Sequence, residues 1–200
     1  MPFNTISVVG LGYIGLPTAA MFASKGKNVI GVDVNQKTVD TINAGNIHIV
    51  EPDLDVIVRD AVSQGYLRAV TTPEAADAFL IAVPTPFFNL DVASGIPQPD
   101  LSFVESAAKA VAVVLKKGDL VILESTSPVG ATEKMAVWLA ECRPDLTFPQ
   151  NAGDESDIRI AHCPERVLPG QVVRELVEND RVIGGITQKC SEAAIQLYET

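Results

Sequence analysis

Three glycines stand at the spacing that lets a backbone turn approach a diphosphate. Gly10, Gly12 and Gly15 follow Thr5–Val9, which is expected to be a buried parallel strand, and residues 13–25 have the pattern of a helix. In such a turn the first glycine allows the tight bend, the second the close approach of a pyrophosphate, and the third the packing of helix on strand. The phosphates bind at the positive end of the helix dipole. This strand–turn–helix context predicts a dinucleotide site, although the glycine triplet alone also occurs in ordinary turns.

An acidic residue follows the next apolar run. Asp33 comes directly after Val29–Val32. A carboxylate at this place accepts hydrogen bonds from the ribose hydroxyls and repels a 2′-phosphate, so it favours NAD over NADP. The alternative is that Asp33 caps a helix, but Asn35 is better placed to cap the helix expected at 36–44.

Composition limits the partners of the chain. The 200 residues are 47% hydrophobic, enough for a substantial core, and carry a formal net charge of −10. That charge argues against nucleic acid or an anionic membrane as partner. No apolar run approaches the ~20 residues that span a bilayer, and the first residues do not resemble a signal peptide. The three cysteines have no metal-binding spacing, so we expect no metal and a cytoplasmic location.

Strand and helix patterns alternate along the chain, which predicts an α/β fold with a doubly wound, Rossmann-like parallel sheet. Further strands are expected at 67–70, 78–83, 120–123, 158–162 and 181–183, and further helices at 52–62, 100–115, 131–141 and 188–200, with a polar loop at 150–157. We expect one NAD-binding domain over 1–187. Residues 188–200 would begin a truncated linker or central helix.

The predicted topology indicates where a ligand binds. In doubly wound sheets ligands lie beyond the carboxyl ends of the strands, at the switch point between the first and fourth strands. The loops after the fourth and fifth predicted strands carry the hydroxyls of Thr85 and Thr126. Both loops should border the cofactor, although their prolines and serines also suit ordinary turns.

The order of these motifs resembles the UDP-glucose/GDP-mannose dehydrogenase family across the whole chain. The shared stretches are Gly10–Gly15, Glu51-Pro52, Val83–Pro86, Ser125–Gly130, Pro164-Glu165 and Asp180–Gly185. The resemblance implies oxidation of a primary alcohol on a nucleotide sugar to a carboxylate by two NAD. In the family a cysteine captures the intermediate aldehyde, and the resulting thioester is hydrolysed.

The resemblance also implies roles for individual residues. The positions that line NAD are Gly10, Gly12, Tyr13, Ile14, Gly15, Asp33, Thr85 and Thr126. Thr126 also approaches the reacting carbon, and Glu165 acts in the hydrolytic step, so these two are the catalytic candidates. The segment along the sugar nucleotide is Glu165, Arg166, Val167 and Leu168. From its chemistry alone, Glu165 could equally cap a turn or pair with Arg166.

One departure bears on the substrate. UDP-glucose dehydrogenases carry a second glutamate four residues after the first, where this chain has Pro169. Proline cannot act as a base. This agrees with the branch that oxidises UDP-N-acetyl-D-mannosamine to the uronate, a precursor of bacterial surface polysaccharide. UDP-glucose and UDP-N-acetylglucosamine remain as alternative substrates, and a non-catalytic NAD-binding module as an alternative class.

A second departure concerns the nucleophile. The Gly-Gly-x-Cys motif of the family does not occur in these residues, and Cys142, Cys163 and Cys190 stand in other contexts. We therefore expect the cofactor-binding part of an enzyme, inactive by itself. The resemblance further implies that the full-length enzyme is a homodimer.

Overall fold

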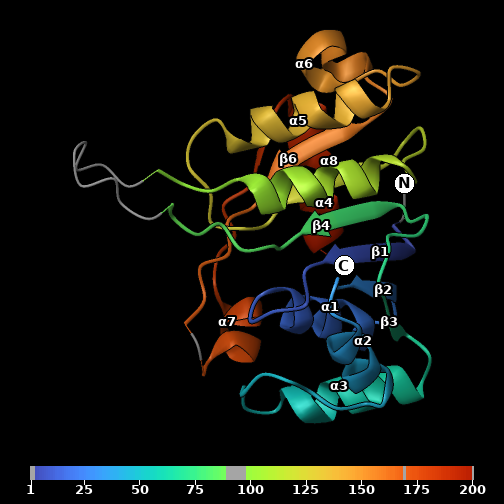
Figure 1. Ribbon diagram of the computed structural model, residues 1–200, viewed down its shortest axis with the longest axis vertical. Helices are drawn as coiled ribbons and strands as arrows, with labels where there is room; N and C mark the ends of the chain where they lie inside the picture. Colours follow the sequence, from blue (N-terminus) through green and yellow to red (C-terminus); the bar gives the residue numbers. More distant parts are fainter. Residues whose placement is uncertain (1–2, 89–97, 169, 200) are drawn as a thin grey trace.

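The computed structural model describes residues 3–88, 98–168 and 170–199 and shows a seven-stranded sheet with helices on both faces (Figure 1). The strands lie in the order β3-β2-β1-β4-β5-β6-β7. They are β1 (Thr5–Val9), β2 (Asn28–Val32), β3 (Leu67–Val70), β4 (Ala78–Ile81), β5 (Leu120–Leu123), β6 (Arg159–His162) and β7 (Gly184–Gly185). Strands β1 to β6 pair in parallel, and β7 pairs antiparallel to β6. The predicted doubly wound, Rossmann-like sheet is confirmed.

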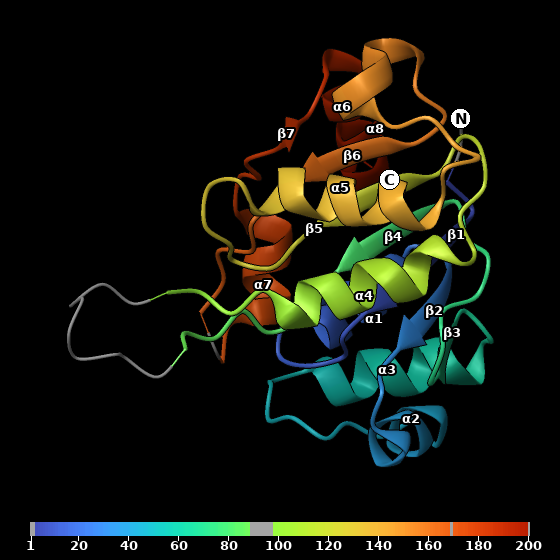
Figure 2. The same ribbon diagram turned by 45° about the horizontal axis from the view of Figure 1, so that its top comes forward.

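Two apolar cores fill the spaces between the sheet and its helices. The helices are α1 (Gly15–Ser24), α2 (Gln36–Asn43), α3 (Leu54–Ser63), α4 (Ser102–Ala112), α5 (Ala131–Cys142), α6 (Pro149–Ala152), α7 (Val172–Glu178) and α8 (Gln188–Tyr198). Side chains of α1, α2, α3 and α8 share one core, and those of α4 and α5 share the other. In Figure 2, α4 and α5 lie in front of the sheet. Strand β4 is buried at every residue because helices cover both of its faces.

The neighbours of β1 set the place of the ligand site. The chain crosses from β3, at one edge, to β4, which pairs with β1 on the side opposite β2. The β1 and β4 ends therefore diverge at the predicted switch point. The loops that leave them open a crevice between two halves of the sheet.

Several predicted bounds are wrong. The helix expected from residue 13 begins at Gly15, and the one expected from Pro52 begins at Leu54, because Asp53 has a left-handed backbone with φ 64°. The predicted loop 150–157 overlaps α6 and contains a short 3₁₀ turn (Gly153–Glu155). The last strand lies at Gly184–Gly185 instead of 181–183 and is antiparallel. Helix α7 was not predicted.

Three predictions fall partly outside the described residues. Pro169, the middle of the loop 84–99 and the last residue of the helix 188–200 are not described. Within the described ranges no helix has both the length and the apolar composition needed to cross a membrane.

The outer strand β3 meets a side chain along its free edge. The amide N–H of Ala69 donates to the side-chain oxygen of Asn43 at 2.7 Å, and the Asn43 amide nitrogen donates back to the Ala69 carbonyl at 2.9 Å. Asn43 is the last residue of α2, so this pair also fixes that helix beside the edge.

Candidate functional site

The carboxyl ends of β1, β4 and β5 border a cleft of about 370 Å³. Its lining includes seven of the eight predicted cofactor residues together with five that were not predicted. The lining residues are Gly10, Leu11, Gly12, Tyr13, Ile14, Asp33, Ala82, Val83, Pro84, Thr85, Ser125 and Thr126. The eighth, Gly15, is buried under the turn. The sequence thus located the cleft from local patterns that follow four separate strands.

The three glycines meet different local constraints. Gly10 has φ 93°, and a Cβ there would lie 2.7 Å from the carbonyl oxygen of Ala82. A Cβ on Gly15 would lie 1.7 Å from the carbonyl oxygen of Gly10, so the turn closes only with glycine at that place. Gly12 is the exception, since its Cβ would meet no atom within 4 Å. The space beside Gly12 is open, as a bound diphosphate would require.

Asp33 closes the cleft at the end of β2. Its carboxylate accepts the amide N–H of Leu11 at 3.1 Å and that of Asn35 at 2.9 Å. A carboxylate has about four acceptor sites, so these two bonds leave capacity for ribose hydroxyls. Asn35 caps α2 by accepting the amide N–H of Lys37, as predicted, and Asp33 is therefore not the helix cap.

Hydroxyl groups join the two loops on the other side of the cleft. The Thr85 hydroxyl donates to the carbonyl of Thr126 at 2.5 Å, and the Ser125 hydroxyl donates to the carbonyl of Val83 at 2.6 Å. These bonds bring the predicted residues Thr85 and Thr126 together and fix the loops after β4 and β5 against each other.

The predicted substrate segment lies apart from this lining. The Glu165 side chain is only 6% exposed, and its Oε1 accepts the amide N–H of Arg166 at 2.7 Å. Its Oε2 faces the guanidinium of Arg181 at 3.7 Å instead of the side chain of Arg166. Arg166 and Leu168 are exposed, while Val167 is half-buried.

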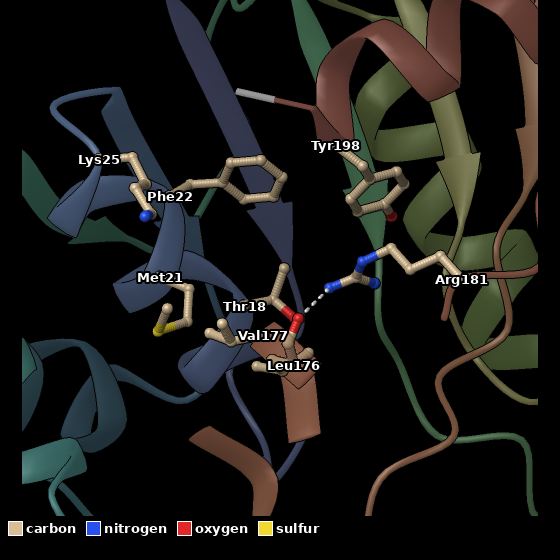
Figure 3. Close-up of a pocket in the computed structure, with 8 residues that line it drawn as sticks. All are labelled: Thr18, Met21, Phe22, Lys25, Leu176, Val177, Arg181 and Tyr198. Atoms are coloured by element: carbon tan, nitrogen blue, oxygen red, sulfur yellow. Dashed lines mark hydrogen bonds between the residues drawn. The ribbon is translucent and has the colours of Figure 1, made fainter. Parts of the chain in front are cut away.

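Arg181, which the sequence did not single out, lies among buried acidic and aromatic groups. Its guanidinium stacks 4.3 Å from the ring centre of Tyr198 and lies 3.9 Å from Oε1 of Glu124. Figure 3 shows Arg181 beside Tyr198 and Thr18, with its bond to the carbonyl of Leu176. The hydroxyls of Thr18 and Tyr198 both donate to Oε1 of Glu124, at 3.5 and 3.3 Å. We call Glu124, Glu165, Arg181 and Tyr198 the buried cluster.

The buried cluster favours a protonated Glu124. This side chain is fully buried, and its Oε2 has no hydrogen-bond partner among the described residues. Burial, together with the negative charge of Glu165, raises the pKa of Glu124 to about 8, against the opposing effects of Arg181 and the two hydroxyls. Near neutral pH Glu124 is therefore mostly neutral, and the charge of Arg181 is left to balance Glu165.

Sequence reasoning had a partial signal for this cluster. Glu165 and Arg181 stand in recognised motifs, and Glu124 comes directly after the apolar Leu120–Leu123. The contacts join residues far apart in the chain, however, and only the folded sheet brings them together.

Comparison with known proteins decides the family. Residues 4–200 match the NAD binding domain of the UDP-glucose/GDP-mannose dehydrogenase family. The chain belongs to that family. Its cofactor is therefore NAD, in agreement with the turn and with Asp33.

Two curated relatives are equally similar to the chain. It is 71% identical to an NDP-N-acetyl-D-galactosaminuronic acid dehydrogenase of Ralstonia nicotianae, covering 98% of this chain and 45% of that protein. It is also 71% identical to a UDP-N-acetyl-D-mannosamine dehydrogenase of Yersinia pestis, covering 100% of this chain and 46% of that protein. The solved UDP-N-acetyl-mannosamine dehydrogenase of Staphylococcus aureus has a TM-score of 0.87 at 42% identity over 98% of this chain and 45% of that one. The chain thus spans just under half the length of these relatives.

Proposed function

We propose that this chain is the cofactor-binding part of an NAD-dependent nucleotide-sugar 6-dehydrogenase that oxidises UDP-N-acetyl-D-mannosamine to UDP-N-acetyl-D-mannosaminuronate. The observation that carries the proposal is the cleft at the switch point. Open space at Gly12 suits the diphosphate of NAD, and the remaining acceptor capacity of Asp33 suits the ribose. Bound NAD would supply the hydride acceptor.

The remaining cofactor residues lie on two sides of the proposed NAD site. Gly10, Gly15, Tyr13 and Ile14 form and flank the phosphate turn, and Thr85 and Thr126 line the opposite loop. The catalytic roles of Thr126 and Glu165 are part of the proposal. So is the binding of the sugar nucleotide along Glu165–Leu168.

The sugar itself has two candidates. N-acetyl-D-mannosamine is favoured by the motifs and by Pro169 in place of a second glutamate, and it is the sugar named for the Yersinia relative. The equal identity to the Ralstonia enzyme favours an N-acetyl-D-galactosamine nucleotide instead. Both are N-acetylated amino sugars, and oxidation of UDP-glucose or UDP-N-acetylglucosamine in preference to both would contradict the proposal.

Asp33→Ala is expected to weaken NAD binding by about ten- to a hundredfold, because charge-assisted hydrogen bonds to the ribose contribute roughly 1.5–3 kcal/mol. The preference for NAD over NADP should become smaller at the same time. Calorimetric titration with both nucleotides measures the change. Asp40→Ala, on the exposed side of α2, is the matched control and should bind NAD normally. Equal NAD affinity of the Asp33 variant and the wild type would refute the ribose role.

The 200-residue chain is expected to bind NAD without oxidising the sugar nucleotide. Covalent capture needs an accessible thiolate, and burial raises the pKa of the Cys163 thiol. Cys190 is buried too, and its sulfur accepts the amide N–H of Ile160. Positioning of the reacting carbon, worth ~7–11 kcal/mol, would also need a second wall of the sugar site.

The test is NADH absorbance after mixing the chain with NAD and UDP-N-acetyl-D-mannosamine. The parent is compared with the triple variant Cys142→Ser, Cys163→Ser, Cys190→Ser. Two NADH per sugar from the parent, lost in the triple variant, would place the nucleophile within these residues and overturn the half-enzyme interpretation.

The same proposal covers the location, oligomeric state and domain boundary of the full-length protein. We propose a cytoplasmic enzyme of surface-polysaccharide precursor synthesis that forms a homodimer when full length. Its domains would divide at residue 187, with α8 leading into a central helix. Helix α8 buries Cys190, Ala194 and Leu197 against the NAD-binding domain from which it would lead. Sedimentation of the full-length polypeptide tests the dimer, and a monomer there would contradict it.

A further inference from the structure

Glu51 is a buried carboxylate that the proposed chemistry leaves without a role. It lies between α2 and α3, is 5% exposed, and reaches across the chain to the start of α7. Its Oε2 accepts the amide N–H of Gly170 at 2.8 Å, and its Oε1 accepts that of Val172 at 2.6 Å. Both carboxylate oxygens are thus committed to backbone groups more than a hundred residues away.

The same stretch of backbone meets two more carboxylates. The amide N–H of Arg166 donates to Glu165 at 2.7 Å, and that of Leu168 donates to Glu175 at 2.8 Å. With the two bonds to Glu51, every second residue from 166 to 172 donates its amide to a glutamate. The stretch up to residue 168 has no regular secondary structure, so these bonds define its path.

Glu51 differs from the other two glutamates in where it comes from. Glu165 directly precedes the stretch, and Glu175 lies one turn into α7, so both are joined to it along the chain. Glu51 belongs to the β1–β3 half of the domain, in which β1 and α1 flank the diphosphate turn. Its two bonds therefore fix the predicted sugar segment relative to the NAD turn.

We propose that Glu51 is a positioning residue for the sugar-nucleotide site, holding the segment Glu165–Leu168 in register with bound NAD through the amides of Gly170 and Val172. This inference rests on the proposed function. Bonds from amides to a carboxylate are shorter and stronger than neutral ones. Small displacements of a reacting group cost much of the rate gained by positioning.

Glu51→Gln tests the proposal with little change in volume. One side-chain oxygen becomes an NH₂ group, which cannot accept an amide N–H, so one of the two bonds is lost. In the full-length polypeptide the KM for UDP-N-acetyl-D-mannosamine should rise about tenfold. The affinity for NAD should stay within about twofold. Hydrogen exchange at the amides of Gly170 and Val172 should become faster.

Two further variants separate positioning from charge and from general stability. Glu178→Gln removes an exposed carboxylate of α7 that pairs with Arg174, and it should leave KM unchanged. Glu51→Asp keeps the charge but is too short to reach both amides, so it should resemble Glu51→Gln. An Asp variant with wild-type KM, or equal losses of NAD and sugar binding in Glu51→Gln, would overturn the positioning role.

The outcomes distinguish this inference from the function on which it rests. If the wild-type polypeptide oxidises none of the UDP-sugars, the proposed function fails and the positioning role fails with it. If the wild type is active and Glu51→Gln retains both its KM and its slow exchange at Gly170 and Val172, only the positioning role fails.

Discussion

Gly12→Val is expected to abolish NAD binding, a loss of ~100-fold or more in affinity, while the domain stays folded. The valine side chain would extend into the space that the pyrophosphate needs. The protein itself has room for it, because a Cβ on Gly12 meets no atom within 4 Å and its backbone is not left-handed. Calorimetry measures the loss of NAD affinity, and thermal unfolding measures the retained fold.

Gly15→Ala makes the matched comparison within the same turn. A single methyl there would lie 1.7 Å from the carbonyl oxygen of Gly10, so the turn and the start of α1 must shift. We expect this smaller substitution to lower the free energy of unfolding substantially, unlike Gly12→Val. Normal NAD binding by the Gly12 variant would place the phosphate site elsewhere.

Glu124→Gln is expected to change how stability depends on pH. The pKa of Glu124 is about 8 in the folded protein, against a usual value of 4.5. Folding therefore takes up a proton between these values, and stability falls as pH rises through them, by up to about 1.4 kcal/mol per pH unit. Glutamine resembles the protonated acid and has no proton to lose, so this loss should disappear in the variant.

Urea unfolding of wild type and variant at pH 5, 6.5 and 8 measures the effect. The free energy of unfolding of Glu124→Gln relative to the wild type should rise steadily across this window. Subtraction removes the groups that titrate in both proteins. Glu141→Gln, at an exposed position of α5, should show no such trend. A constant difference between Glu124→Gln and the wild type would mean that Glu124 is ionised throughout.

Local sequence patterns were sufficient to predict most strands of the sheet. Leu67–Val70 and Leu120–Leu123 have the same bounds in sequence and structure. Leu120–Leu123 is apolar and buried at every residue, as expected of a strand covered on both faces, whereas Leu67–Val70 includes the exposed Arg68. Helix α7 was not predicted because it is short and has no capping side chain of its own. Its first amide N–H, at Val172, donates to the distant Glu51 instead. The last strand was misplaced because two glycines pair there, and glycine gives no apolar signal.

The NAD turn and the buried cluster also differ in how far their residues stand apart in the sequence. The NAD turn is local, since Gly10, Gly12 and Gly15 stand within six residues, so their spacing together with the strand before and the helix after predicted it. Arg181 was not singled out because its partners come from the loops after β5 and β6 and from α8. Charged side chains are mostly exposed, so burial of Arg181 could not be expected before the fold showed which groups surround it.

The pairing of Asn43 with Ala69 has a consequence for solubility. An exposed edge strand offers unpaired N–H and C=O groups that can recruit another chain and begin aggregation. Asn43 occupies both groups of Ala69 with its amide, as a further strand would, and so blocks the middle of the β3 edge. At the other edge β7 is only two residues long, too short to template a new strand. The sheet is thereby protected at both edges against intermolecular β-pairing.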